Sequence, residues 1–164
     1  MTPTEFIQLA RERNPTLPDA NILSLIETDE HFRCAVCEEL NKTVAESDRA
    51  LARHILKLYI ESHRGDKWGM SDEIRLSAFL LYKIGNVEDV PLLWKAKEAN
   101  FDTFCGLDIQ LLVGAGVEET LAYLKGLSDK DSLAAAIYIT ECRDAGDFKY
   151  IHGYAEEWDS YFSN

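Results

Sequence analysis

The chain has 164 residues and a formal net charge of −12, from 17 Lys and Arg against 29 Asp and Glu. Its composition, 46% hydrophobic and 28% charged, is that of one globular domain and excludes a disordered chain. The acidic excess argues against nucleic acid and anionic membranes as partners, because both attract clusters of Lys and Arg. Either the acidity only keeps the protein soluble, or it serves binding, in which case a basic protein is the partner that it favours.

A capping box opens the first predicted helix. Thr2 is placed to cap it, Pro3 suits its first turn, and Glu5 can reach back to the cap. We expect this helix to end before the proline-containing segment 14–18. Apolar residues at helical spacing then predict two further helices, over residues 18–27 and 29–41.

A second capping box, at Thr43 and Glu46, predicts the start of the longest helix, residues 44–63. Its apolar residues form two adjacent stripes, which indicates a central helix buried on two sides. Two glycines in residues 64–70 predict a break after it.

From residue 71 the pattern becomes repetitive. Ser71 caps a helix that runs to about Ile84, and Gly85 turns the chain into the next helix. A similar turn follows about 30 residues later at Gly116, and residues 145–151 give a third copy. A helix–turn–helix unit at this period is typical of an α-solenoid, in which each helix pair buries its apolar face against the next.

Residues 81–93, with the sequence LYKIGNVEDVPLL, resemble a HEAT-like repeat of the short kind found in phycobilin-lyase-type proteins. In that family an apolar helix ends in Gly, Asp or Asn caps, and Val-Pro-Leu-Leu opens the second helix. The likeness is good over residues 71–99 and weaker over 101–126 and 128–162, where the later copies lack the proline. It implies little about activity.

The resemblance implies stacked helical pairs, and the pattern along the whole chain predicts a single all-α domain of about nine to ten helices with no sheet. Residues 1–63 would form the N-terminal helices, and residues 71–162 would form about three stacked antiparallel helix pairs.

The most unusual stretch is residues 100–110, where polar, small and aromatic residues replace a plainly apolar helix. Gly106 within a helix indicates that something approaches closely. Either that neighbour is the adjacent helix, with Asp108 and Gln110 solvated or facing a helix, or it is a ligand or protein in a groove. With the acidic turn of the next repeat added, the candidate binding residues are Trp94, Lys97, Asn100, Asp102, Asp108, Gln110, Glu118 and Glu119.

Cys34 and Cys37 form a Cys-x-x-Cys motif, with His31 on the same side of the predicted helix. Zinc would require a further ligand pair, and redox use would require a thioredoxin-like setting. Core packing is therefore the interpretation that we adopt, with metal or redox use as the alternative, and we expect no metal and no cofactor.

Residues 1–13 are amphipathic rather than continuously apolar, and no apolar run reaches the ~18 residues of a membrane span. The four cysteines are scattered in a chain large enough to fold without disulfides. We therefore expect a cytoplasmic protein with reduced thiols, either a monomer or a weak homodimer.

Two functions follow from the sequence. The first is a non-enzymatic protein-interaction module whose acidic part, with 17 acids against 8 bases after residue 70, binds a basic protein. A toxin-neutralising immunity or inhibitor protein is a specific version of it. The alternative is a small-ligand-binding protein, or an enzyme of lyase or hydrolase type, that uses a groove near residues 94–110.

Overall fold

The fold is all-helical, as the sequence predicts. The computed structural model describes residues 1–65 and 68–163, and across these ranges the chain forms ten α-helices, four 3-10 helices and no β-strand. The α-helices are α1 (Pro3–Arg13), α2 (Ala20–Thr28), α3 (Glu30–Thr43), α4 (Arg49–His63), α5 (Asp72–Ile84), α6 (Val90–Lys97), α7 (Phe101–Gly106), α8 (Val117–Gly126), α9 (Lys130–Ala145) and α10 (Tyr154–Phe162). The 3-10 helices are η1 (Glu46–Asp48), η2 (Val87–Asp89), η3 (Ile109–Val113) and η4 (Ile151–Gly153). None of the described helices is long and apolar enough to cross a membrane.

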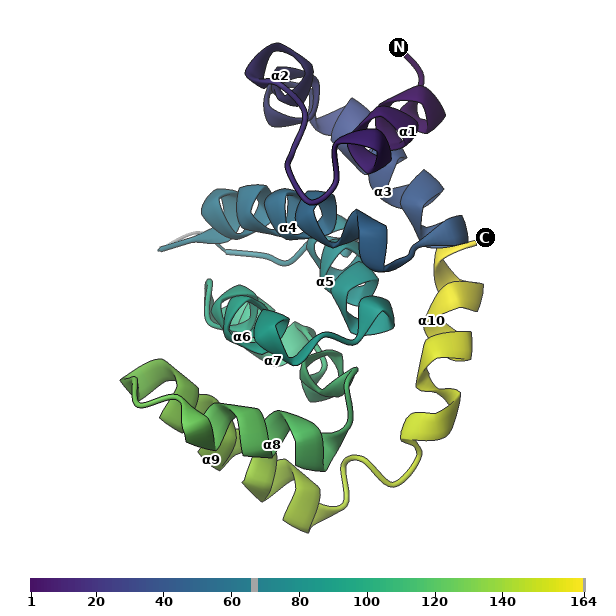
Figure 1. Cartoon of the computed structure of the whole chain (residues 1–164). Helices are drawn as coiled ribbons and strands as arrows, with labels where there is room; N and C mark the ends of the chain where they lie inside the picture. Colours follow the sequence, from purple (N-terminus) through teal and green to yellow (C-terminus); the bar gives the residue numbers. More distant parts are fainter. Residues whose placement is uncertain (66–67, 164) are drawn as a thin grey trace.

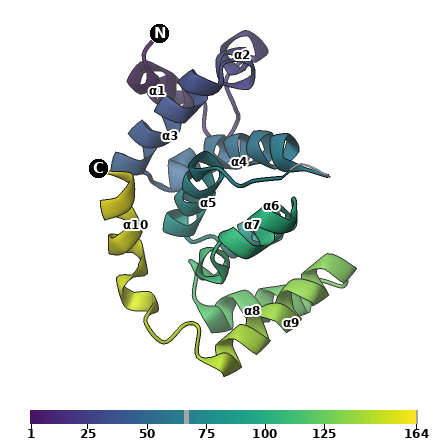
Figure 2. The same ribbon diagram turned by 180° about the vertical axis from the view of Figure 1, so that it is seen from behind.

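The helices are stacked in layers. In Figure 1, helices α1 to α3 form one end, followed by α4 with α5, α6 with α7, and α8 with α9. Figure 2 shows the same order from behind. Helix α4 packs against both α5 and α6, and α6 packs against α9, so one hydrophobic core runs through the stack. As predicted, α4 is buried on two sides, along Leu51 and Ile55 and along Ala52 and Leu56.

The predicted helix ends agree with the structure at several points. Thr2 and Glu5 form the capping box of α1, and the Ser71 hydroxyl accepts a hydrogen bond from the backbone N–H of Ile74. Gly85 ends α5 with φ of 70°, a left-handed conformation that a residue with a Cβ rarely adopts. The break predicted at 64–70 separates α4 from α5, but residues 66 and 67 lie outside the described residues.

The capping box predicted at Thr43 is wrong. Helix α3 continues to Thr43, and α4 begins only at Arg49, after η1. The acid that reaches back is Asp48, whose carboxylate accepts a hydrogen bond from the backbone N–H of Ala45 at 2.9 Å. The start of α4 therefore depends on this side chain and not on Glu46, and α9, with 16 residues, is longer than α4, with 15.

Two buried carboxylates join successive layers. Asp48, at the end of η1, accepts two hydrogen bonds from the Arg11 guanidinium of α1, at 2.7 and 2.9 Å. Asp89 occupies the same position at the end of η2 and accepts from Arg49 and Arg53 of α4. Because each pair joins the start of a new helix to the layer before it, the two pairs fix the spacing of the layers. The sequence gives no local sign of this pairing.

Helix α10 differs from the expected second member of a third helix pair. It runs along the side of the stack, back toward α3 (Figures 1 and 2). Its aromatic residues pack on α5: Tyr154 contacts Tyr82, and Phe162 contacts Phe79, with ring centroids 5.1 and 5.8 Å apart. The predicted aromatic stripe of this helix is therefore a packing surface, and its partner is α5.

Candidate functional site

Lys97 is a buried residue of α6 whose side chain is hydrogen-bonded to the end of α7. Its side chain is 3% exposed, and its ammonium group donates hydrogen bonds to the carbonyl oxygens of Phe104 and Leu107. These carbonyls lie at the C-terminal end of α7, where a helix leaves acceptors unpaired and favours positive charge. Burial lowers the pKa of Lys97, and the nearby Asp108 carboxylate opposes that shift.

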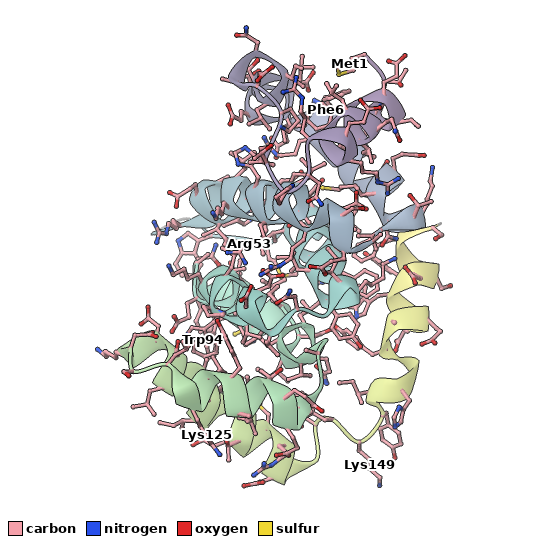
Figure 3. All side chains as sticks on the ribbon, in the orientation of Figure 1. Met1, Phe6, Arg53, Trp94, Lys125 and Lys149 are labelled. Carbon is pink, nitrogen blue, oxygen red and sulfur yellow. The ribbon has the colours of Figure 1, made fainter. Side chains whose placement is uncertain are left out.

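Trp94 packs in the same region, between α6, α7 and α9. Its indole lies between α6 and the α8–α9 layer (Figure 3) and contacts the rings of Phe104 and Tyr138. It is 3% exposed, and its Nε1 has no hydrogen-bond acceptor among the described residues. Trp94 therefore supports the candidate site by packing in the interior of the molecule.

Asn100 and Asp102 are hydrogen-bonded to the segment that connects α4 and α5. The Asn100 side chain caps α7 by accepting from the Thr103 N–H, and it donates to the carbonyls of His63 and Gly69. The Asp102 carboxylate accepts a hydrogen bond from the Gly69 N–H. Asp102 is the cap that the sequence predicts for this helix, and that expectation is wrong: Asn100 is the cap, and Asp102, two residues further on, contacts another segment.

Asp108 and Gln110 hold the C-terminal segment in place. The Tyr154 hydroxyl donates to the Asp108 carboxylate at 3.0 Å, and the Gln110 amide donates to the Asp147 carbonyl at 2.8 Å. Both side chains are half-buried. Each of the two side chains thus contacts a neighbouring element.

A hollow of about 350 Å³ nevertheless lies beside these residues, lined by α7, η3 and α9. Lys97, Asp108 and Gln110 belong to its wall, together with Tyr138 and Cys142 of α9. Burial, more than any neighbouring group, raises the pKa of both Tyr138 and Cys142. Their hydroxyl and thiol groups therefore stay protonated at neutral pH, which suits hydrogen bonding better than nucleophilic attack.

The two remaining candidates lie on the exposed surface of α8. Glu118 pairs with Arg143 of α9 at 3.1 Å. The Glu119 carboxylate lies against the preceding turn, next to Gly116, which has φ of 109°. A side chain at position 116 would collide with it, because a Cβ there would lie 2.0 Å from Glu119 Oε2. Neither glutamate lines the hollow, so the eight candidates do not form one site.

A feature that the sequence analysis missed is the outer face of α9. Leu133 is 60% exposed and Ile137 is 52% exposed, although the opposite face of the helix buries Ala135 and Ile139. Apolar residues thus occupy both sides of this helix, a pattern typical of a helix covered all round. The signal was present in the run LAAAIYI, where apolar residues follow one another without helical spacing.

No family model, no curated protein and no solved structure matches this chain. The likeness to HEAT-like repeats therefore stays a prediction from the motif in residues 81–93.

The Cys-x-x-Cys motif is incorporated into the core. Cys37 is fully buried and Cys34 is half-buried, and burial raises the pKa of Cys34 to about 11 and raises that of Cys37 as well. Thiols of this kind are poorly reactive. No group of three or more His, Cys, Asp or Glu in the described part of the chain is arranged to hold a metal ion.

Proposed function

We propose that this protein is a non-enzymatic protein-interaction module that binds a basic protein through the outer face of α9. A toxin-neutralising immunity or inhibitor protein is the specific form that we favour. The observation that carries the proposal is the pair Leu133 and Ile137, exposed side by side at helical spacing on the last layer of the stack.

The position of this pair supports docking. A terminal layer of a helical stack ordinarily has a polar outer face, because nothing packs against it. Here two large aliphatic residues occupy that face, and burying the part of each that is still exposed would contribute about 1–1.5 kcal/mol. A partner helix with its own apolar stripe would complete the layer.

The charge around the pair favours a basic partner. Glu141 and Asp144 continue the exposed face of α9 toward its C-terminus, and Glu118 lies beside Arg143 on the neighbouring helix. One base, Lys130, lies at the opposite end of this face. Lys or Arg residues flanking the partner's apolar stripe would therefore find complementary charge at its acidic end.

The test is capture of proteins from lysate on the immobilised chain, followed by affinity measurement with the captured protein. Ile137→Ser and Glu141→Lys should each reduce binding at least tenfold, and added salt should weaken the wild-type complex. Leu25→Ser is the matched control, because Leu25 is a 37% exposed leucine on α2 at the other end of the stack. Equal binding by wild type and Ile137→Ser, or a captured protein without basic character, would contradict the proposal.

One observation favours the alternative, a small-ligand-binding protein or an enzyme of lyase or hydrolase type. The hollow beside Lys97 brings Asp108, Gln110 and Tyr138 to one place. In that case the Ile137→Ser and Glu141→Lys variants would retain full function, which separates the two proposals.

We further propose that the protein is cytoplasmic and that it is a monomer or a weak homodimer until its partner binds. All four cysteines are free, as befits a reducing compartment.

A further inference from the structure

A second hollow, of about 440 Å³, lies in the N-terminal half of the molecule between α4 and the connection from α1 to α2. Figure 1 shows this connection descending in front of α4. Arg49, Arg53 and Lys57 line the hollow from α4, together with His54. In a chain of net charge −12, three fixed cations around one opening are a local reversal of the overall charge.

The three cations form a row. Arg49, Arg53 and Lys57 are spaced four residues apart on one helix, so they share a face, with a rise of about 6 Å between neighbours. The opposite wall is apolar, with Pro15 and Leu17 of the α1–α2 connection. A molecule in the hollow would thus contact positive charge on one side and aliphatic surface on the other.

Buried Asp89 orients the two guanidinium groups. Arg49 donates to it through Nε and Nη2, and Arg53 donates through Nη1. The remaining donors, Arg49 Nη1, Arg53 Nε and Nη2 and Lys57 Nζ, have no acceptor among the described residues. A guanidinium that is held in place loses less freedom when it binds an anion, which favours binding.

The neighbouring carboxylates do not cancel the positive charge. Two carboxylates offset two of the three cations: Asp89, which is bonded to the arginines, and Glu46, which lines the hollow. Glu88 also contacts Arg49, but its side chain is 61% exposed, and a solvated ion pair of this kind is weak. The side chains of Arg49 and Arg53 remain 22% and 31% exposed and are open to a ligand.

We propose that this hollow is a binding site for a small organic anion, a molecule that carries a phosphate or carboxylate group on an apolar body. Its volume lies within the range of small-molecule sites, about 300–1,000 Å³. Charge-assisted hydrogen bonds from Arg53 and Lys57 would hold the anionic group, and Pro15 and Leu17 would cover the apolar body. This site is separate from the outer face of α9. The proposal for it does not depend on the function proposed for the outer face of α9.

The test is a titration of the full chain with inorganic phosphate, phenyl phosphate and benzoate, followed by amide chemical shifts and calorimetry. Phenyl phosphate should bind more tightly than inorganic phosphate, because only the former reaches the apolar wall. Preference for phenyl phosphate over benzoate would identify a phosphate site, and the reverse preference a carboxylate site. Shifts should concentrate in residues 14–17 and 49–57.

Lys57→Gln should weaken binding about tenfold, the effect of losing one hydrogen bond to a charged group. Lys57 is the clean position because it makes no ion pair among the described residues, so its loss leaves the fold intact. Lys125→Gln, which removes another exposed lysine, is the matched control and should leave the affinity unchanged. Absence of saturable binding by all three probes, or equal weakening in both variants, would overturn the proposal.

Discussion

At the scale of single residues, the most consequential side chains are buried charges that join segments far apart in the sequence. Asp89 has no exposed surface and holds two arginines of α4, while Lys97 satisfies two carbonyls at the end of α7. Such groups are stable only while their partners are present, because an unpaired buried charge is costly. They therefore identify the positions at which the layers depend on one another.

We predict that Asp89→Asn destabilises the protein by about 2 kcal/mol, because the amide cannot neutralise Arg49 and Arg53. This is below the ~3–5 kcal/mol of a fully buried pair, since both arginines are partly hydrated. Urea unfolding measures the difference. Glu88→Gln is the matched control: it removes the exposed carboxylate on the same arginine and should change the stability by less than about 1 kcal/mol. Equal effects of the two substitutions would contradict the role assigned to Asp89.

At the scale of helices, local chemistry predicted several of the helix starts and ends, while long-range contacts decided the others. Ser71 and Gly85 mark the ends of α5 because capping needs only neighbouring residues. Thr43 failed as a cap because Asp48 is held by Arg11, 37 residues away, and this contact fixes where α4 begins. The same limit applies to the candidate site: the contacts of Asp108 and Gln110 come from the C-terminal segment, which periodicity cannot place.

Helix α10 is held by a hydrogen bond whose strength depends on pH. Burial, and then the Asp108 carboxylate, raise the pKa of Tyr154 above its ordinary value of about 10. The folded chain therefore keeps the phenolic proton more firmly than the unfolded chain. The resulting stabilisation is complete below pH 10 and is lost progressively as the pH rises above it.

We predict that Tyr154→Phe lowers the stability by about 1–2 kcal/mol at pH 8, because Asp108 loses its donor. The difference from wild type should shrink by about 1 kcal/mol by pH 11, because only the wild type loses the stabilisation by Tyr154. Urea unfolding at the two pH values measures it. Tyr150→Phe removes the hydroxyl of a tyrosine that is 81% exposed and should have no effect at either pH. A difference that stays constant with pH would show that Tyr154 contributes by packing alone.

At the scale of the whole molecule, α10 connects layers that a simple stack would leave independent. It is tied to η3 through Asp108 and to α5 through Phe79 and Tyr82, and Asp159 reaches Lys83, which also contacts the end of α3. In an open stack each layer contacts only its neighbours, so the ends can unfold separately. A helix that crosses several layers couples them. Because α10 runs along the side of the stack, it leaves the outer face of α9 exposed.

This coupling predicts how the molecule opens. In the wild type, amides in the middle of α5 and of α9 should exchange with similar opening free energies, because α10, which follows α9 in the chain, is packed on α5. Phe162→Ala removes the contact with Phe79 at the free end of α10. We expect it to lower the opening free energy of α8 and α9 by at least 1 kcal/mol more than that of α4 and α5. Hydrogen exchange measured by mass spectrometry resolves the two regions, with Tyr150→Ala, at an exposed position outside the helix, as the control. If Phe162→Ala lowered protection equally in both regions, α10 would stabilise the fold without coupling its layers.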